Sequence, residues 1–177
     1  MMETERLLIK KTCFDDLRHF AEWETQRHVT DFFSIDKGRS YEGVVRESIL
    51  WEQDSSILQF TIFLKKENAP IGRIYISGIN PNLRSLDITR IYIGDMSHRG
   101  KGFGEEAMKL ILEYCFTQLN AERITLDHFE GNEVAASLYL KLGFQYEGIA
   151  RNACKRDGKY YNVHYMSMLR AEYFAKK

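Results

Sequence analysis

The spacing of apolar residues along the chain alternates between two periods. Short apolar runs rich in β-branched residues predict strands, because such side chains fit a pleated, half-buried surface. These runs cover residues 6–10, 57–65, 71–79, 85–94, 123–129, 146–154 and 160–169. Apolar residues three or four positions apart predict helices instead, one following residues 12–16 and others over residues 40–51, 102–119 and 134–142.

The order of these elements narrows the fold class. It runs strand, two helices, three strands, helix, strand, helix and two strands, and no internal repeat or linker divides residues 1–177. The pair Asp157-Gly158 predicts a tight hairpin between the last two strands, and residues 66–70 separate an earlier pair. We therefore expect one α/β (α+β) domain that is long enough to bury a full core.

A glycine-rich segment joins the strand at 85–94 to the helix at 102–119. Gly100, Gly102 and Gly104 alternate with other residues there, and Arg99 and Lys101 add positive charge. Glycines let a ligand approach backbone N–H groups, and the start of the following helix offers further unpaired donors. The segment is therefore a candidate binding site for an anion such as a pyrophosphate.

The glycine spacing distinguishes between phosphate-binding motifs. It matches neither the dinucleotide fingerprint G-x-G-x-x-G nor the P-loop pattern. Residues 99–104 do resemble the signature Arg/Gln-x-x-Gly-x-Gly/Ala of the GCN5-related N-acetyltransferases, the GNAT superfamily, with Arg99, Gly102 and Gly104 at the signature positions. In that family this loop holds the pyrophosphate of acetyl-CoA.

A second motif carries the same resemblance. Residues 132–144 are similar to the family pattern Asn-x-x-Ala-x-x-x-Tyr-x-x-x-Gly-Phe, with Asn132, Ala135, Tyr139, Gly143 and Phe144 at its fixed positions. Segments 116–120 and 146–160 resemble sequences from one branch of the family. That branch holds ribosomal-protein N-terminal acetyltransferases and bacterial spermidine acetyltransferases. The resemblance implies a mixed, mostly antiparallel twisted sheet of six to seven strands flanked by helices, with splayed central strands.

The resemblance also assigns the residues that bind acetyl-CoA. The strand before the glycine loop is expected to pair with pantetheine through its free backbone groups, and Asn132 to offer its amide to a pantetheine carbonyl. Asn132 is equally suited to cap the helix that follows it. The expected contacts are Ile91, Tyr92, Ile93, Gly94, Arg99, Gly100, Lys101, Gly102, Phe103, Gly104 and Asn132.

Catalysis by this family needs an acid and a base. By resemblance, Tyr139 protonates the departing thiolate. An amine with a pKa near 10 must lose a proton before it attacks. Asp127 matches a position where some relatives carry a base, His128 titrates nearer neutrality, and Glu130 is a third candidate. Because neighbouring residues in a strand face opposite sides, we expect only one of Asp127 and His128 to reach the cleft.

Composition excludes several other classes. Lys and Arg balance Asp and Glu at 25 each, which argues against a general nucleic-acid or membrane binder. Cys13, Cys115 and Cys154 form neither a disulfide framework nor a zinc pattern, and we expect no metal site and no cysteine nucleophile. With no apolar stretch of membrane-spanning length and no apolar leader at the N-terminus, we expect a cytoplasmic protein.

The acceptor is the least specified part of the prediction. Residues 21–56 hold eight acidic and four basic residues among aromatic ones, which would suit a cationic acceptor such as a polyamine, an aminoglycoside or a protein α-amino group. The loop at 33–40 has only one acid, Asp36, where spermidine enzymes carry an acidic cluster. Arg90 and Asp87 are candidates to orient the substrate. A non-catalytic acyl-CoA sensor is the alternative, and the oligomeric state, a homodimer included, stays open.

Overall fold

Eight strands form one sheet in the part of the chain that the structure, a computed structural model, describes: residues 1–33 and 39–176. The order across the sheet is β1-β2-β3-β4-β5-β6-β8-β7. The strands are β1 (Met2–Glu3), β2 (Leu7–Lys11), β3 (Leu58–Leu64), β4 (Ala69–Asn80), β5 (Ser85–Ile93), β6 (Arg123–Phe129), β7 (Gln145–Arg156) and β8 (Lys159–Leu169). All neighbours are antiparallel except β5 and β6.

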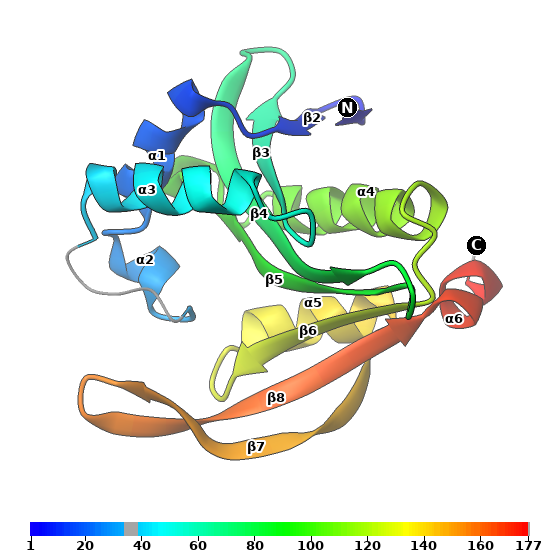
Figure 1. Cartoon of the computed structure of the whole chain (residues 1–177). Coiled ribbons are helices and arrows are strands. Elements are labelled where there is room, and N and C mark those ends of the chain that lie inside the picture. Colours follow the sequence, from blue (N-terminus) through cyan, green and yellow to red (C-terminus); the bar gives the residue numbers. More distant parts are fainter. Residues whose placement is uncertain (34–38, 177) are drawn as a thin grey trace.

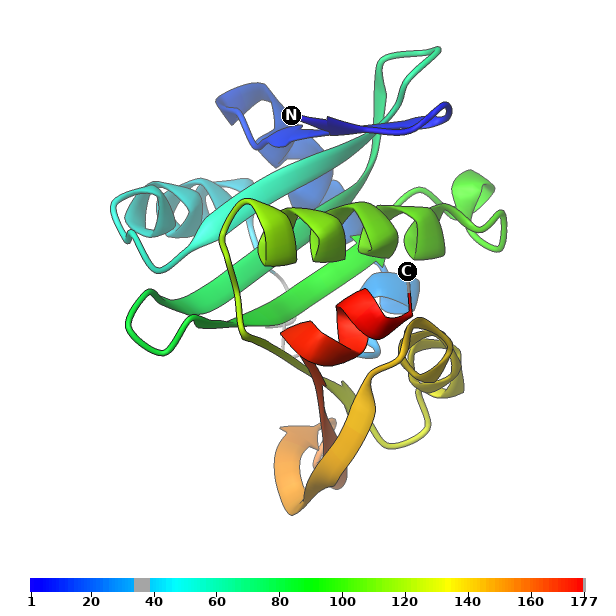
Figure 2. The same ribbon diagram turned by 90° about the vertical axis from the view of Figure 1, so that its right-hand side faces the viewer.

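The helices lie on both faces of this sheet, as Figures 1 and 2 show. They are α1 (Leu17–Trp23), α2 (Arg27–Thr30), α3 (Tyr41–Glu52), α4 (Phe103–Thr117), α5 (Glu133–Leu142) and α6 (Arg170–Ala175), with short 3-10 turns η1 (Phe14–Asp16) and η2 (Met96–His98). The larger core packs α4 and α5 against the sheet, and a smaller one packs α1, α2 and α3 on the other face. In the described residues no helix is long and apolar enough to cross a membrane.

The predicted element order is confirmed, and the differences concern short elements. The predicted six to seven strands fall short of the eight observed because β1, only two residues long, has no recognisable pattern. Two helices, α2 and α6, were also missed, having four and six residues. Gly143, a fixed position of the second motif, ends α5 with a φ of 107°, a left-handed conformation that favours glycine.

The two central strands separate after a short pairing. β5 and β6 are parallel, and their register covers only Ser85–Asp87 against Arg123–Thr125. Beyond Thr125, β6 stays paired with β8 along its whole length. Figure 1 shows β6 turning away from β5 beyond the paired residues. The expected splay of the central strands is therefore present.

An irregularity in β5 changes which face its side chains take. The register with β4 shifts between the pairs Tyr75–Arg90 and Ser77–Asp87, so one extra residue of β5 lies between them. Before this bulge Leu86 and Ile88 belong to the core under α4. After it, Tyr92 packs in the core with α1 to α3. A bulge redirects side chains in this way, and it lies here next to the splay.

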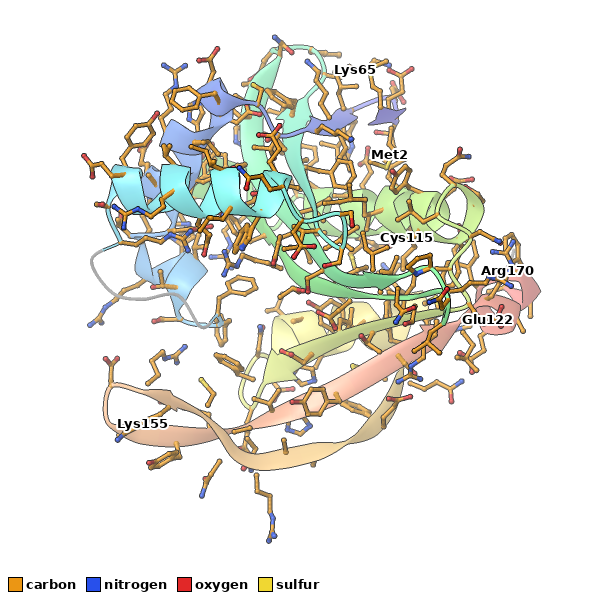
Figure 3. The ribbon with its side chains drawn as sticks, in the orientation of Figure 1. Met2, Lys65, Cys115, Glu122, Lys155 and Arg170 are labelled. Carbon is orange, nitrogen blue, oxygen red and sulfur yellow. The ribbon has the colours of Figure 1, made fainter. Side chains whose placement is uncertain are left out.

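The last hairpin projects from the rest of the sheet. Lys155, labelled in Figure 3, lies close to its tip, where Asp157 and Gly158 make the predicted tight turn with positive φ values of 49° and 79°. At the opposite end of β8, the backbone N–H of Arg170 donates to the carbonyl of Glu122, and both residues are labelled together in Figure 3. This contact ties α6 to the start of β6.

Candidate active site

A cavity of about 350 Å³ opens where β5 and β6 separate. Its walls come from β5, the end of β6, the glycine loop, α5 and residues of the α2 region. Most of the predicted site residues line it: Ile91, Tyr92, Ile93, Arg99, Gly100, Gly102, Phe103, Gly104, Asp127, His128, Asn132 and Tyr139. The splay thus brings together the two motifs that the sequence places apart.

The glycine loop forms one end of the cavity. Gly100 and Gly102 have φ values of 72° and 80°, a left-handed conformation that favours glycine, and Gly102 is the N-cap of α4. A Cβ added at Gly100 or Gly104 would meet no other described atom within 4 Å. The backbone is therefore open to the cavity at the positive end of a fifteen-residue helix, beside Arg99. This arrangement fits a pyrophosphate group.

Two of the expected acetyl-CoA contacts lie outside the cavity lining. A Cβ at Gly94 would come within 2.2 Å of the Trp23 ring, so glycine is required there by packing. The carbonyl of Gly94 is 2.8 Å from Nε2 of His28. Lys101 is exposed, and its carbonyl accepts from Nη1 of Arg6 at 3.3 Å. Neither Gly94 nor Lys101 is therefore among the residues that line the cavity, and each has other contacts.

Asn132 caps the helix that carries Tyr139. Its side-chain oxygen accepts from the backbone N–H of Ala135 at 3.2 Å, and the residue also lines the cavity. The side-chain NH₂ group is a separate donor, so capping and a ligand contact are compatible. Asn132 therefore caps α5 as expected, and its NH₂ group is available for the proposed contact with pantetheine.

Tyr139 is held in a buried position on α5. Its side chain is 8% exposed and contacts the rings of Phe144 and His128. Burial raises the pKa of Tyr139 well above its usual value, and the carboxylates of Asp127 and Asp87 raise it further. The phenol therefore keeps its proton at neutral pH, as a general acid must.

Asp127 lies across the splay, near the end of β6. Its side chain is open to the cavity, yet the surrounding protein removes part of its hydration. This desolvation, with the neighbouring carboxylate of Asp87, raises the pKa of Asp127 to about 6. Asp87 is itself fixed by the hydroxyls of Thr89 and Thr125, both at 2.7 Å. Asp127 is thus ionised at pH 7 while being more basic than an ordinary carboxylate.

His128 has other partners, although it also lines the cavity. It is buried and stacks on His164 with ring centroids 4.9 Å apart. Nδ1 is 3.1 Å from the carbonyl of Phe129, and Nε2 is 3.3 Å from the hydroxyl of Tyr146. Burial lowers the pKa of His128. With both ring nitrogens engaged, the geometry supports His128 less well than Asp127 as the base, and Glu130 is exposed outside the lining.

A buried charge cluster borders the cavity, and sequence reasoning missed it. Oε1 of Glu24 accepts from Arg73 at 2.6 Å, from Tyr92 at 2.9 Å and from Arg90 at 3.3 Å. Its other oxygen is 3.3 Å from Arg39, which also pairs with Glu47. Burial alone would raise the pKa of Glu24, but Arg73, Arg90 and Arg39 together lower it. One signal was available, since Glu24 is the residue that ends α1 and follows the buried Phe20 by four positions, one helical turn.

This cluster changes the meaning of the acidic segment at 21–56. Glu24 is only 1% exposed, and Glu47 is paired with Arg39, so neither presents a free carboxylate to a cationic ligand. Asp36 and Lys37, which entered the comparison with spermidine enzymes, lie outside the described residues. The acid count of the segment therefore overstates the negative charge at the cavity.

Cys115, labelled in Figure 3, lies on α4 in the larger core and is not among the residues that line the cavity. It is fully buried, and burial raises the pKa of its thiol to about 12. A thiol in this state is not a nucleophile at neutral pH.

Comparison with known proteins agrees with this geometry. A family model described as an acetyltransferase (GNAT) domain matches residues 6–145. Uncharacterized N-acetyltransferase p20 of Bacillus licheniformis is 28% identical over 176 residues, covering 96% of each chain. Spermidine N(1)-acetyltransferase of Escherichia coli (strain K12) is 28% identical over 165 residues, covering 92% of this chain and 85% of the relative.

The fold also matches a solved structure along nearly its whole length. A crystal structure of spermidine N-acetyltransferase from Vibrio cholerae, in complex with CoA and spermine, superposes with a TM-score of 0.89. The two sequences are 25% identical, and the match covers 97% of this chain and 99% of the other.

Proposed function

The chain belongs to the GNAT acetyltransferase family and is an acetyl-CoA-dependent acyltransferase, and we propose that it transfers the acetyl group directly to a primary amine within a ternary complex. Tyr139 acts as general acid and Asp127 as base. The observation that carries this proposal is that one cavity is lined by a phenol kept protonated and by a carboxylate kept ionised yet basic.

Asp127 prepares the acceptor. An ammonium group enters the cavity beside this carboxylate and gives it one proton, directly or through a water molecule. That proton then passes from Asp127 to solvent. The amine nitrogen then attacks the thioester carbonyl carbon. A pKa of about 6 suits Asp127 to this step, because the carboxylate is largely unprotonated at pH 7 and still accepts a proton more readily than an ordinary aspartate.

Tyr139 completes the transfer. As the adduct collapses, the carbon–sulfur bond breaks, and the phenol protonates the departing thiolate. The amine nitrogen then loses its second proton to the tyrosinate, directly or through water, so Tyr139 is a phenol again and the enzyme returns to its starting state. Backbone N–H groups of β5 that face the splay can stabilise the negative charge on the carbonyl oxygen, and the glycine loop and Asn132 hold the donor in place.

The acceptor is a primary amine, and three classes fit that description. Relatives named as spermidine acetyltransferases favour a polyamine. The wider branch similarity favours a protein N-terminal α-amine, and an aminoglycoside is the third candidate. Among the described residues that line the cavity, the acids are Asp127 and Glu105, and Glu105 is paired with Lys109 and Lys141, so the lining lacks the several free carboxylates that a polyamine would use.

Release of free CoA thiol tests the proposal. The purified protein is incubated with acetyl-CoA and a panel of spermidine, peptides starting with Ala or Ser, aminoglycosides and amino acids, and mass spectrometry identifies the acetylated product. We expect thiol release only when an amine is present, with intersecting initial-velocity lines. An acetylated enzyme formed without amine would contradict direct transfer, and binding of acetyl-CoA without turnover on any amine would indicate a sensor instead.

A further inference from the structure

Arg90 lies in the cavity wall, although it belongs to a buried charge cluster. The bulge in β5 turns Arg90 toward α1 on the same face as Tyr92. Its side chain is 10% exposed and lines the cavity, and its guanidinium carbon is 5.9 Å from the centre of the Phe33 ring. Arg90 is therefore largely buried and borders the cavity.

The partners of Arg90 leave most of its donors unused. Three guanidinium groups, on Arg39, Arg73 and Arg90, share the two carboxylates of Glu24 and Glu47. Arg73 holds Oε1 of Glu24 at 2.6 Å, whereas Arg90 reaches the same oxygen only at 3.3 Å and through Nη1 alone. Among the described residues Nε and Nη2 of Arg90 have no hydrogen-bond acceptor. Counted over the described residues, the cluster thus has one more positive charge than negative charge, and Arg90 is its loosest member.

An uncompensated charge in a partly buried site favours an anionic ligand. A guanidinium group stays charged under all relevant conditions and binds a carboxylate through two parallel N–H groups. Arg90 has such a pair of donors on the side away from Glu24. Removing the carboxylate from water costs free energy, which is regained only where the pair forms in good hydrogen-bonding geometry, and the two parallel N–H donors of a guanidinium group provide that geometry.

We propose that Arg90 binds a carboxylate carried by the acceptor itself, so that the acceptors are small molecules with both an amine and a carboxylate, as in amino acids. This inference rests on the proposed function, because it takes the cavity to be the acceptor site. Asp127 would receive the ammonium end and Arg90 the carboxylate end of one zwitterion. Both residues line the same cavity, which therefore holds a group of each sign.

A polyamine meets a less suitable surface in the described residues. Its additional ammonium groups would need carboxylates, but the acids that line the cavity are Asp127 and Glu105. Glu105 belongs to the glycine-loop end and is paired with Lys109 at 2.8 Å and Lys141 at 2.6 Å. One of the additional ammonium groups would instead approach Arg90, a charge of the same sign.

Binding measurements test this inference without relying on turnover. Calorimetry on the protein saturated with CoA compares each common L-amino acid with its carboxamide, and both with spermidine. We expect at least one amino acid to bind about tenfold or more tightly than its carboxamide, since a charged hydrogen-bonded pair is lost in the amide. Equal binding of all such pairs, no binding of any amino acid, or tighter binding of spermidine than of every amino acid would overturn it.

Variants test whether the preference for an amino acid over its carboxamide depends on Arg90. Arg90→Gln should abolish the difference between acid and carboxamide, and Arg90→Lys should restore part of it. Arg39→Gln is the matched control, because Arg39 contacts the same Glu24 carboxylate from outside the cavity lining, so the preference should persist. Thermal unfolding of each variant shows whether it is folded, and a preference retained by folded Arg90→Gln would refute the assignment.

Thiol release separates this inference from the proposed function. If a carboxylate preference in binding is found but no amine supports thiol release, the carboxylate-binding role of Arg90 stands, and the proposed function fails together with the identification of that ligand as an acceptor. If amines are acetylated without any carboxylate preference in binding, the proposed function stands and the inference fails.

Discussion

Two side chains of the cavity have pKa values shifted in the same direction, with opposite consequences for chemistry. Burial keeps Tyr139 a phenol over the whole physiological range, because its pKa was already high. The same kind of shift brings the pKa of Asp127 only to about 6, so it remains a carboxylate at pH 7. The splay between β5 and β6 therefore places a proton donor and a proton acceptor in one cavity.

Replacing Tyr139 by phenylalanine tests its role as the proton donor. The ring should still pack against Phe144, so the protein should remain folded, while kcat falls by about 10²- to 10⁴-fold through loss of general acid catalysis. Steady-state thiol release measures the effect. Tyr114→Phe, a partly buried tyrosine of α4 outside the cavity lining, is the control and should retain wild-type kcat. An undiminished rate in Tyr139→Phe would remove the assignment.

The pH dependence of kcat/KM tests the role of Asp127 as the base. Asp127 is the active base when ionised, so kcat/KM should fall as the pH drops through about 6. Asp127→Asn should lower kcat/KM by roughly a hundredfold and lose this acidic limb. Glu130→Gln, an exposed neighbour outside the cavity lining, should keep both the rate and the limb. A limb that disappears in Glu130→Gln instead would make Glu130 the base.

Residue roles could be predicted where a motif fixes them and not where distant residues combine. The spacing from Asn132 to Tyr139 is local, so the sequence placed both on one helix, and both line the cavity. Arg90 and Glu24 are 66 positions apart and meet only through tertiary packing. The sequence suggested Arg90 as a residue that orients the substrate, and its burial beside Glu24 could not be inferred.

At the scale of elements, the glycine loop was predictable and the bulge in β5 was not. Alternating glycines before an amphipathic helix are a local pattern, and Gly102 indeed caps α4. In β5 both faces are covered by helices, with Leu86 and Ile88 buried on one face and Arg90 and Tyr92 on the other. Alternation cannot show which face a buried side chain takes when both faces are apolar.

The glycine loop can be tested apart from the stability of the chain. Gly102→Ala places a Cβ on a backbone with φ of 80°, and it should raise the KM for acetyl-CoA by about tenfold or more by distorting the amides that face the pyrophosphate. Gly78→Ala meets the same conformational penalty, about 1–2 kcal/mol, at φ of 59° on an exposed part of β4. We expect similar losses in thermal stability but a changed KM only in Gly102→Ala. Equal KM values would contradict the role of the loop.

At the scale of the whole molecule, the sheet consists of two parts joined by a short seam. β1 to β5 form one part, and β6, β8 and β7 form the other. Only three residue pairs link β5 to β6, and the cavity occupies the opening beyond them. A ligand in this opening contacts both parts, so its binding should couple them. The splay was expected only from the resemblance to the family, because local sequence patterns carry no information on how far two strands stay paired.

Hydrogen exchange of backbone amides measures that coupling. Acetyl-CoA or CoA at 100 times its Kd stabilises the bound form by about 2.7 kcal/mol, which corresponds to about a hundredfold slower exchange for amides that open only when the ligand leaves. We expect this slowing in peptides covering residues 88–94 and 126–132, which border the opening. Peptides of β2 and β3, paired along their whole length and remote from the cavity lining, serve as the internal control and should change little. Equal slowing in all strands would show that the ligand stabilises the fold as a whole and does not bridge the seam.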